Sequence, residues 1–76
     1  MKIECNDGFT FSMITGSGTY SMPGCAELGF PSEPDELLEP HRERLNEDPT
    51  ECVYPYTPLT VVAQLLKKHN HDANDN

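Results

Sequence analysis

The residues of this chain that are most suited to a chemical role are carboxylates spaced three or four positions apart. In a helix, residues at this spacing share one face, and a row of carboxylates there attracts the Arg and Lys side chains that proteins use to hold phosphates. The carboxylates with this spacing are Glu33, Glu36, Glu39, Glu43 and Glu47. They predict an acidic ridge about 21 Å long at ~1.5 Å per residue, suited to a basic groove on a partner protein.

The same charges have a simpler interpretation, as a solvated face that keeps a small domain in solution. Like charges at these spacings destabilise a helix by a few tenths of a kcal/mol per pair, so stability alone does not favour the ridge. Small phage-encoded anti-defence proteins, including some anti-CRISPR and anti-restriction proteins, act as acidic DNA mimics. This chain is similar to them in size and charge only, without a shared motif, and both interpretations stay open.

The thiols and imidazoles are weaker candidates for chemistry. Cys5, Cys25 and Cys52 with His41 supply donor types that zinc prefers, but the close cysteine pairs of structural zinc sites are missing. A catalytic thiol needs an adjacent base, and the sequence around Cys25 supplies an acid, Glu27. We therefore expect no metal, no cofactor and no enzymatic activity, with the cysteines reduced and mostly buried.

A second candidate for binding is the segment 54–58, where Tyr54 and Tyr56 alternate with prolines. Tyrosines in a stiff extended segment lose little entropy when they dock on a partner. The alternative is that one of the two rings packs beneath a following helix. The segment thus predicts either a docking site for a structural or assembly subunit, or a local packing contact.

The elements that position these residues begin with β-structure over 1–24. Apolar and polar residues alternate over 9–13, which is typical of a half-buried strand with Phe9, Phe11 and Met13 on one face. The turn residues 6–8 predict a hairpin with a preceding strand. A second turn at 15–18 and a third strand over 19–22, stopped by Pro23 and Gly24, complete a predicted three-stranded antiparallel meander.

The acidic segment 32–47 predicts a helix, with Ser32 as N-cap and Asp35 three residues later. Pro40 opposes a straight helix, because proline lacks the backbone donor and clashes with the preceding turn. We therefore expect either one kinked helix or two short helices. In one roughly continuous helix, Leu37, Leu38, His41 and Leu45 lie opposite the acidic ridge, whereas a split at Pro40 breaks the ridge into two shorter clusters.

An extended connector over 48–58 leads to a C-terminal amphipathic helix, capped by Thr57 with Pro58 at its first position. The buried face of this helix is predicted to comprise Leu59, Val62, Leu65, Leu66 and His69. The order of elements indicates an α+β fold with helices on one face of a small sheet. Residues 1–69 are expected to form one domain, followed by a disordered tail over 70–76.

The charge is concentrated in the middle of the chain. Of a formal net charge of −8 over 76 residues, the stretch 27–51 carries −7, from nine acidic residues and two arginines. Direct binding to nucleic acid or an anionic membrane needs clustered Lys and Arg, so we expect neither. No run approaches the ~20 apolar residues of a membrane span, and the first residues do not have the pattern of a signal peptide.

Together these observations predict a cytoplasmic, non-enzymatic binding protein. Its expected partner is a protein with a basic groove that handles nucleic acid, which this chain inhibits or sequesters. A homodimer is also consistent with so short a chain, because small domains bury little surface on their own.

Overall fold

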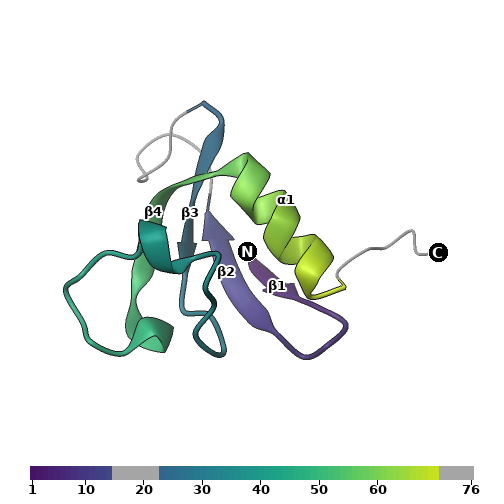
Figure 1. The fold of residues 1–76 in the computed structure, drawn as a ribbon, viewed down its shortest axis with the longest axis horizontal. Helices are drawn as coiled ribbons and strands as arrows, with labels where there is room; N and C mark the ends of the chain where they lie inside the picture. Colours follow the sequence, from purple (N-terminus) through teal and green to yellow (C-terminus); the bar gives the residue numbers. More distant parts are fainter. Residues whose placement is uncertain (15–22, 71–76) are drawn as a thin grey trace.

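The computed structural model describes residues 1–14 and 23–70. Its strands pair antiparallel in chain order to form one four-stranded sheet, and a C-terminal helix lies across one face of that sheet (Figure 1). The elements are β1 (Lys2–Glu4), β2 (Thr10–Ile14), β3 (Cys25–Gly29), β4 (Val53–Pro58) and α1 (Leu59–Lys68). The predicted α+β class, antiparallel sheet and C-terminal helix are confirmed, whereas the prediction of three strands is wrong because the sheet has four.

The N-terminal hairpin forms as its alternation predicts. Ile3 of β1 lies opposite Phe11 of β2, and Phe9 and Phe11 are buried. Gly8 in the turn has φ 95°, a conformation that glycine adopts without a steric penalty. The carboxylate of Asp7 accepts a hydrogen bond from the backbone N–H of Phe9 at 2.9 Å, which closes the turn.

The third strand of the sheet comes later in the chain than predicted. The expected strand over 19–22 lies outside the described residues, and β3 begins at Cys25, directly after the Pro-Gly pair that was interpreted as a stop. Ala26 and Leu28 of β3 are buried in the core. The pair Pro23-Gly24 therefore leads into a strand rather than ending the sheet.

The fourth strand, β4, was predicted only as an extended connector. Its residues pair with β3, with Leu28 opposite Tyr54 and an irregular register between Ala26 and Leu28. Pro55 and Pro58 are compatible with this pairing because β4 is an edge strand, where a missing N–H costs little.

The predicted helix over 32–47 does not form. In its place are turns and one 3-10 turn, η1 (Glu39–His41), and a second 3-10 turn, η2 (Pro49–Glu51), follows the segment. Pro40 lies in the first turn of η1, and Arg42 directly after it is extended, with ψ 132°. The helical propensity of this segment is thus overcome by proline and by the mutual repulsion of its carboxylates.

The residues predicted to cap that helix have other partners. The hydroxyl of Ser32 accepts a hydrogen bond from the backbone N–H of Thr10 at 3.0 Å, so it fastens the chain to β2. The carboxylate of Asp35 accepts from the backbone N–H of Leu37 at 2.8 Å. Asp35 thus stabilises a turn, as short polar residues often do outside helices, whereas Ser32 makes a long-range contact.

The C-terminal helix α1 packs as predicted along most of its apolar face. Val62, Leu65 and His69 are buried, whereas Leu59 at its start remains 46% exposed, contrary to the prediction. The N-cap position is Pro58, with no side-chain hydrogen bond. Thr57 is not the cap because its hydroxyl donates to the carbonyl of Tyr54 at 2.8 Å.

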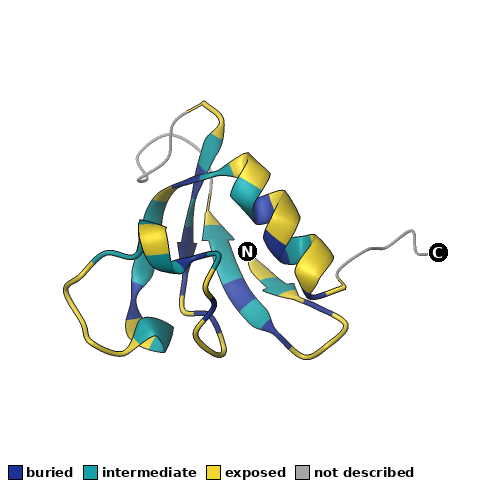
Figure 2. Ribbon diagram, in the orientation of Figure 1, coloured by how far each residue is buried: buried dark blue, intermediate teal, exposed yellow. Residues whose placement is uncertain are grey.

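A single core joins the sheet to α1 (Figure 2). Its buried apolar residues are Cys5, Phe9, Phe11, Ala26, Leu28, Leu38, Cys52, Tyr54, Val62 and Leu65. Within the part of the chain that the structure describes, no helix has the length and apolar character needed to cross a membrane.

Candidate protein-interaction surface

The acidic connector, defined here as residues 33–51, links β3 to β4. In Figure 1 most of it runs along the left and lower side of the molecule, away from α1, and Figure 2 shows that much of it is exposed. Leu38 anchors the connector because its side chain is fully buried in the core. A backbone hydrogen bond from Glu43 to the carbonyl of Val53, at 3.0 Å, holds a second point against β4.

Arg42 organises the middle of the acidic connector. Its guanidinium donates to Glu39 Oε2 at 2.9 and 3.1 Å, and to the backbone carbonyls of Asn46 and Glu47 at 3.2 and 3.4 Å. Arg44 donates to the same oxygen of Glu39 at 2.7 Å. These hydrogen bonds from Arg44 and Arg42 hold the pKa of Glu39 below its usual value. Both arginines of the connector are therefore engaged by one glutamate.

The other glutamates of the predicted ridge have no positive partner in the described part of the chain. Glu33, Glu36 and Glu47 are exposed, and Glu43 is partly buried. Because the segment is not helical, the spacing of three and four residues does not place them along one helical face. The structure thus presents an irregular, exposed acidic loop instead of a regular acidic ridge.

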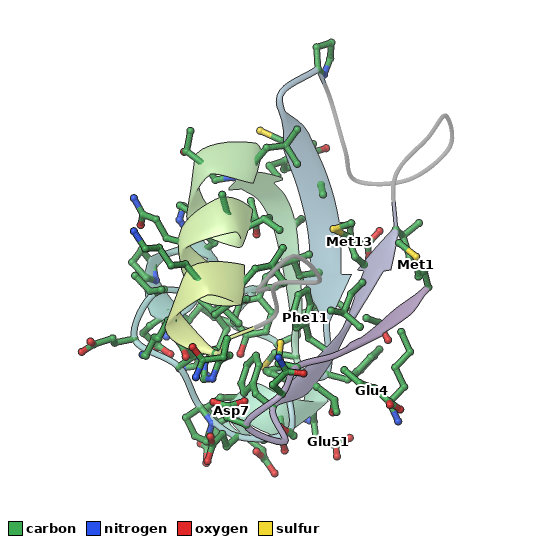
Figure 3. All side chains as sticks on the ribbon, turned by 90° about the vertical axis from the view of Figure 1, so that its right-hand side faces the viewer. Met1, Glu4, Asp7, Phe11, Met13 and Glu51 are labelled. Carbon is green, nitrogen blue, oxygen red and sulfur yellow. The ribbon has the colours of Figure 1, made fainter. Side chains whose placement is uncertain are left out.

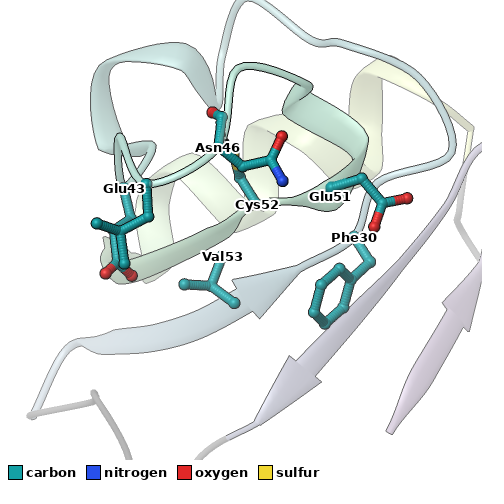
Figure 4. Close-up of a pocket in the computed structure, with 7 residues that line it drawn as sticks. Phe30, Glu43, Asn46, Glu51, Cys52 and Val53 are labelled. Atoms are coloured by element: carbon teal, nitrogen blue, oxygen red, sulfur yellow. Dashed lines mark hydrogen bonds between the residues drawn. The ribbon is translucent and has the colours of Figure 1, made fainter.

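An apolar hollow lies beside the acidic connector (Figure 4). It has a volume of about 140 Å³ and is lined by Phe30, Glu43, Leu45, Asn46, Glu51, Cys52 and Val53. Leu45 was predicted in the apolar stripe opposite the acidic ridge, yet it is 87% exposed at the hollow. No local sequence pattern predicts this hollow, because its walls come from the residue after β3, from the connector and from the start of β4.

The two tyrosines of β4 differ in their surroundings. Tyr54 is buried in the core, and its hydroxyl donates to the carbonyl of Pro49 at 2.7 Å. Burial is the main cause that raises the pKa of Tyr54 to about 12. Tyr56 is 49% exposed and has φ 57°. Only Tyr56 presents a large part of its ring to a partner.

A partly buried polar cluster joins three distant parts of the chain, and no local sequence pattern indicates it. His69 at the end of α1 places Nδ1 2.6 Å from Asp7 of the hairpin turn and Nε2 2.7 Å from Asp35 of the connector. Lys68 Nζ lies 3.2 Å from the same oxygen of Asp35. The ring of Phe9 stacks on the imidazole with centroids 3.9 Å apart. Figure 3 shows Asp7 at the hairpin turn.

The geometry of this cluster requires a charged imidazole. Each ring nitrogen faces a carboxylate oxygen, so both nitrogens must donate. Burial lowers the pKa of His69, but the hydrogen bonds to Asp35 and Asp7 outweigh it and raise the pKa above its usual value. Burial likewise raises the pKa of Asp35, and the hydrogen bonds from His69, Leu37 and Lys68 bring it below the usual value.

The cluster is arranged for stability rather than for catalysis or metal binding. Both nitrogens of His69 are occupied by carboxylates, so the ring has no lone pair for a proton or a metal. Among the described residues no group of three or more His, Cys, Asp and Glu side chains is placed to hold a metal ion. Burial, followed by the charge of Asp7, raises the pKa of the nearby Cys5 thiol, which disfavours the reactive thiolate.

No family model matches this chain, and no curated protein or solved structure matches it either. Function must therefore be inferred from the charge, exposure and geometry of the described residues. The features that suit contact with another macromolecule are the acidic connector and the apolar hollow beside it.

Proposed function

We propose that this protein is a non-enzymatic binding protein whose acidic connector contacts a basic surface of a protein partner. The observation that carries the proposal is that Arg42 and Arg44, the two arginines of the connector, both bind the carboxylate of Glu39. This pairing leaves the exposed carboxylates of Glu33, Glu36 and Glu47 without an ion pair in the described residues. A complementary basic surface relieves their mutual repulsion and steers association over a distance.

The partner class that best fits this charge is a protein that handles nucleic acid, which this chain inhibits or sequesters. Arg and Lys side chains that hold phosphates also bind carboxylates, often in bidentate pairs. The proposal rests on the density of exposed charge and not on a regular spacing, because the acidic segment lacks the predicted helix. The likeness to phage anti-defence proteins extends to size and charge alone.

A synthetic peptide of alternating Lys and Arg serves as the probe for this proposal. We expect the peptide to bind the full chain, and its affinity to fall at least tenfold between about 50 and about 200 mM salt. Duplex DNA should compete with the protein for the peptide, because its phosphates bind the same Lys and Arg side chains of the peptide. Binding that is insensitive to salt and to DNA contradicts the proposal.

A pair of variants with matched net charge separates the acidic connector from bulk charge. The double variant Glu36→Gln/Glu47→Gln and the single variant Glu4→Lys each make the net charge less negative by the same amount. All three positions are exposed. We expect the double variant to weaken peptide binding severalfold more than Glu4→Lys does. Equal effects from both variants show that only the total charge matters.

A second candidate function, that of an assembly subunit, is favoured by Tyr56. Its ring is half exposed although its backbone has φ 57°, a conformation that bulky residues rarely adopt. Self-association or docking through this ring should tolerate salt and should be lost in Tyr56→Ala. Light scattering of the full chain and of this variant, at low and high salt, tests it.

A further inference from the structure

The apolar hollow of Phe30, Leu45 and Val53 is too small for a cofactor. Its volume of about 140 Å³ lies well below the ~300 Å³ at which ordinary ligand pockets begin. A cavity of about 150 Å³ holds a single benzene ring. The hollow therefore has room for one large side chain.

Phe30, in the wall of this hollow, is held in an unfavourable conformation. Its φ is 53°, which costs a residue with a Cβ roughly 1–2 kcal/mol relative to ordinary backbone. Its backbone N–H donates to the carbonyl of Cys52 at 3.0 Å, and the residue remains 54% exposed. Strain at an exposed aromatic residue is typical of functional positions, because folding alone does not reward it.

Leu45, on another side of the hollow, is also exposed without a packing role. At 87% exposure its side chain contributes little to the core. The backbone around it is nevertheless fixed, because Arg42 binds the carbonyls of Asn46 and Glu47. The exposed apolar groups of the hollow are thus presented on an ordered segment.

The rim of the hollow determines which partner it suits. Glu43 and Glu51 line it, and no Lys or Arg is among the lining residues. Figure 4 shows Glu43 to the left of Val53 and Glu51 beside Phe30. A second copy of this chain is a poor occupant, because its net charge of −8 repels the rim. A positively charged partner is attracted to it.

We propose that the hollow receives one large apolar side chain, aromatic or branched aliphatic, from a partner segment whose neighbouring residues are Lys or Arg. The proposal rests on the function proposed above and adds the sequence type that the partner carries. In it the hollow supplies apolar contact at the centre, and the surrounding carboxylates supply the charged periphery, as in the central anchors of protein interfaces.

Labelled synthetic peptides test this proposal by fluorescence anisotropy with the full chain. The first peptide, Lys-Arg-Gly-Phe-Gly-Arg-Lys, contains the anchor, and the second replaces its Phe with Gly. The third keeps the Phe but replaces the basic residues with Glu. We expect the first peptide to bind at least about tenfold more tightly than the second, because a buried Phe adds apolar contact. The third should not bind.

A matched pair of protein variants locates the contact. Leu45→Ser changes an exposed residue of the hollow, and Leu59→Ser changes an exposed residue of α1. Neither side chain is in the core, so both variants should fold. We expect Leu45→Ser to remove most of the advantage of the first peptide over the second, and Leu59→Ser to leave it unchanged.

The outcomes separate this inference from the function on which it rests. Equal binding of the first two peptides, or equal effects of the two variants, overturns the anchor while leaving the acidic connector as a binding surface. Equal binding of the first and third peptides overturns the role of charge and with it the proposed function. Self-association that Leu45→Ser abolishes assigns the hollow to a second copy and also overturns the inference.

Discussion

His69 connects the hairpin turn, the acidic connector and the end of α1 through its two ring nitrogens. The sequence predicted only that this residue lies on the buried face of the helix. Its partners Asp7 and Asp35 are 62 and 34 residues away, and no local spacing relates residues so far apart. Such a cluster can be found only once the elements are placed in space.

The cluster predicts a stability maximum in mildly acidic solution. The raised pKa of His69 means that its contribution is complete below the usual histidine value of about 6.5 and is lost as pH rises through the folded value. The lowered pKa values of Asp7 and Asp35 mean that their contribution is present above about 3.9 and is lost as pH falls through the folded values. Thermal unfolding should therefore have its highest midpoint between about pH 4 and 6.5.

The variant His69→Gln tests whether His69 causes the loss of stability at higher pH. It should be less stable by about 1–3 kcal/mol at pH 5.5, because glutamine is uncharged and its single NH2 group cannot replace both ring nitrogens that face Asp7 and Asp35. Its unfolding midpoint should change little as pH rises above about 6.5, where the parent chain loses stability. A parent-like fall over that interval in His69→Gln contradicts the role given to this histidine.

At Phe30 we expect a glycine variant to be more stable than an alanine variant, the reverse of the usual order. At φ 53° alanine retains the steric cost and glycine does not, so Phe30→Gly should be more stable than Phe30→Ala by about 1 kcal/mol. Denaturant unfolding of both variants measures this difference. Greater stability of the alanine variant shows that the backbone at Phe30 is not strained.

At the scale of elements, local patterns predicted the hairpin and α1 but not β3 and β4. The alternation over 9–13 and the helical spacing after Pro58 are local signals that survive into the fold. The pairing of β3 with β4 joins segments separated by the acidic connector, so no local pattern predicts it. The prolines of β4 argued against a strand there, because proline is compatible only with an edge strand. The acidic segment has helical spacing, which is why a helix was predicted. The helix does not form because Pro40 and the repulsion between carboxylates oppose it.

The acidic connector owes its order to Arg42, which predicts a local effect of removing that side chain. Cys52 is buried beneath the connector, and its thiol lies 3.2 Å from the carbonyl of Asn46. In Arg42→Ala the connector should open more often, so that alkylation of Cys52 becomes roughly tenfold faster. Mass spectrometry of the alkylated peptides distinguishes Cys52 from Cys25.

Arg44→Ala is the matched control for this experiment. Arg44 bonds only the carboxylate of Glu39 among these groups and its side chain is 62% exposed, so its loss should leave the alkylation rate of Cys52 nearly unchanged. An equal increase in both variants indicates that charge, and not the bonds to the connector backbone, controls access to the thiol.

In the whole molecule, the outer part of the acidic connector and the helix α1 lie on different sides. Figure 1 shows α1 and the β1–β2 hairpin on the right and the outer part of the acidic connector on the left. The basic residues Lys67 and Lys68 lie in the last turn of α1, and the stretch 27–51 carries a net charge of −7. A partner that is attracted by this field should therefore approach the connector and not the helix.

Mapping of backbone amide shifts tests whether the acidic connector is the binding surface. The isotope-labelled full chain is titrated with the peptide of alternating Lys and Arg at low salt. The largest shifts should fall within residues 33–51 and at Phe30 and Val53 beside them, with α1 and β1 almost unaffected. Shifts that are largest around Glu4 or along α1, or that spread evenly over all exposed acidic residues, contradict this prediction.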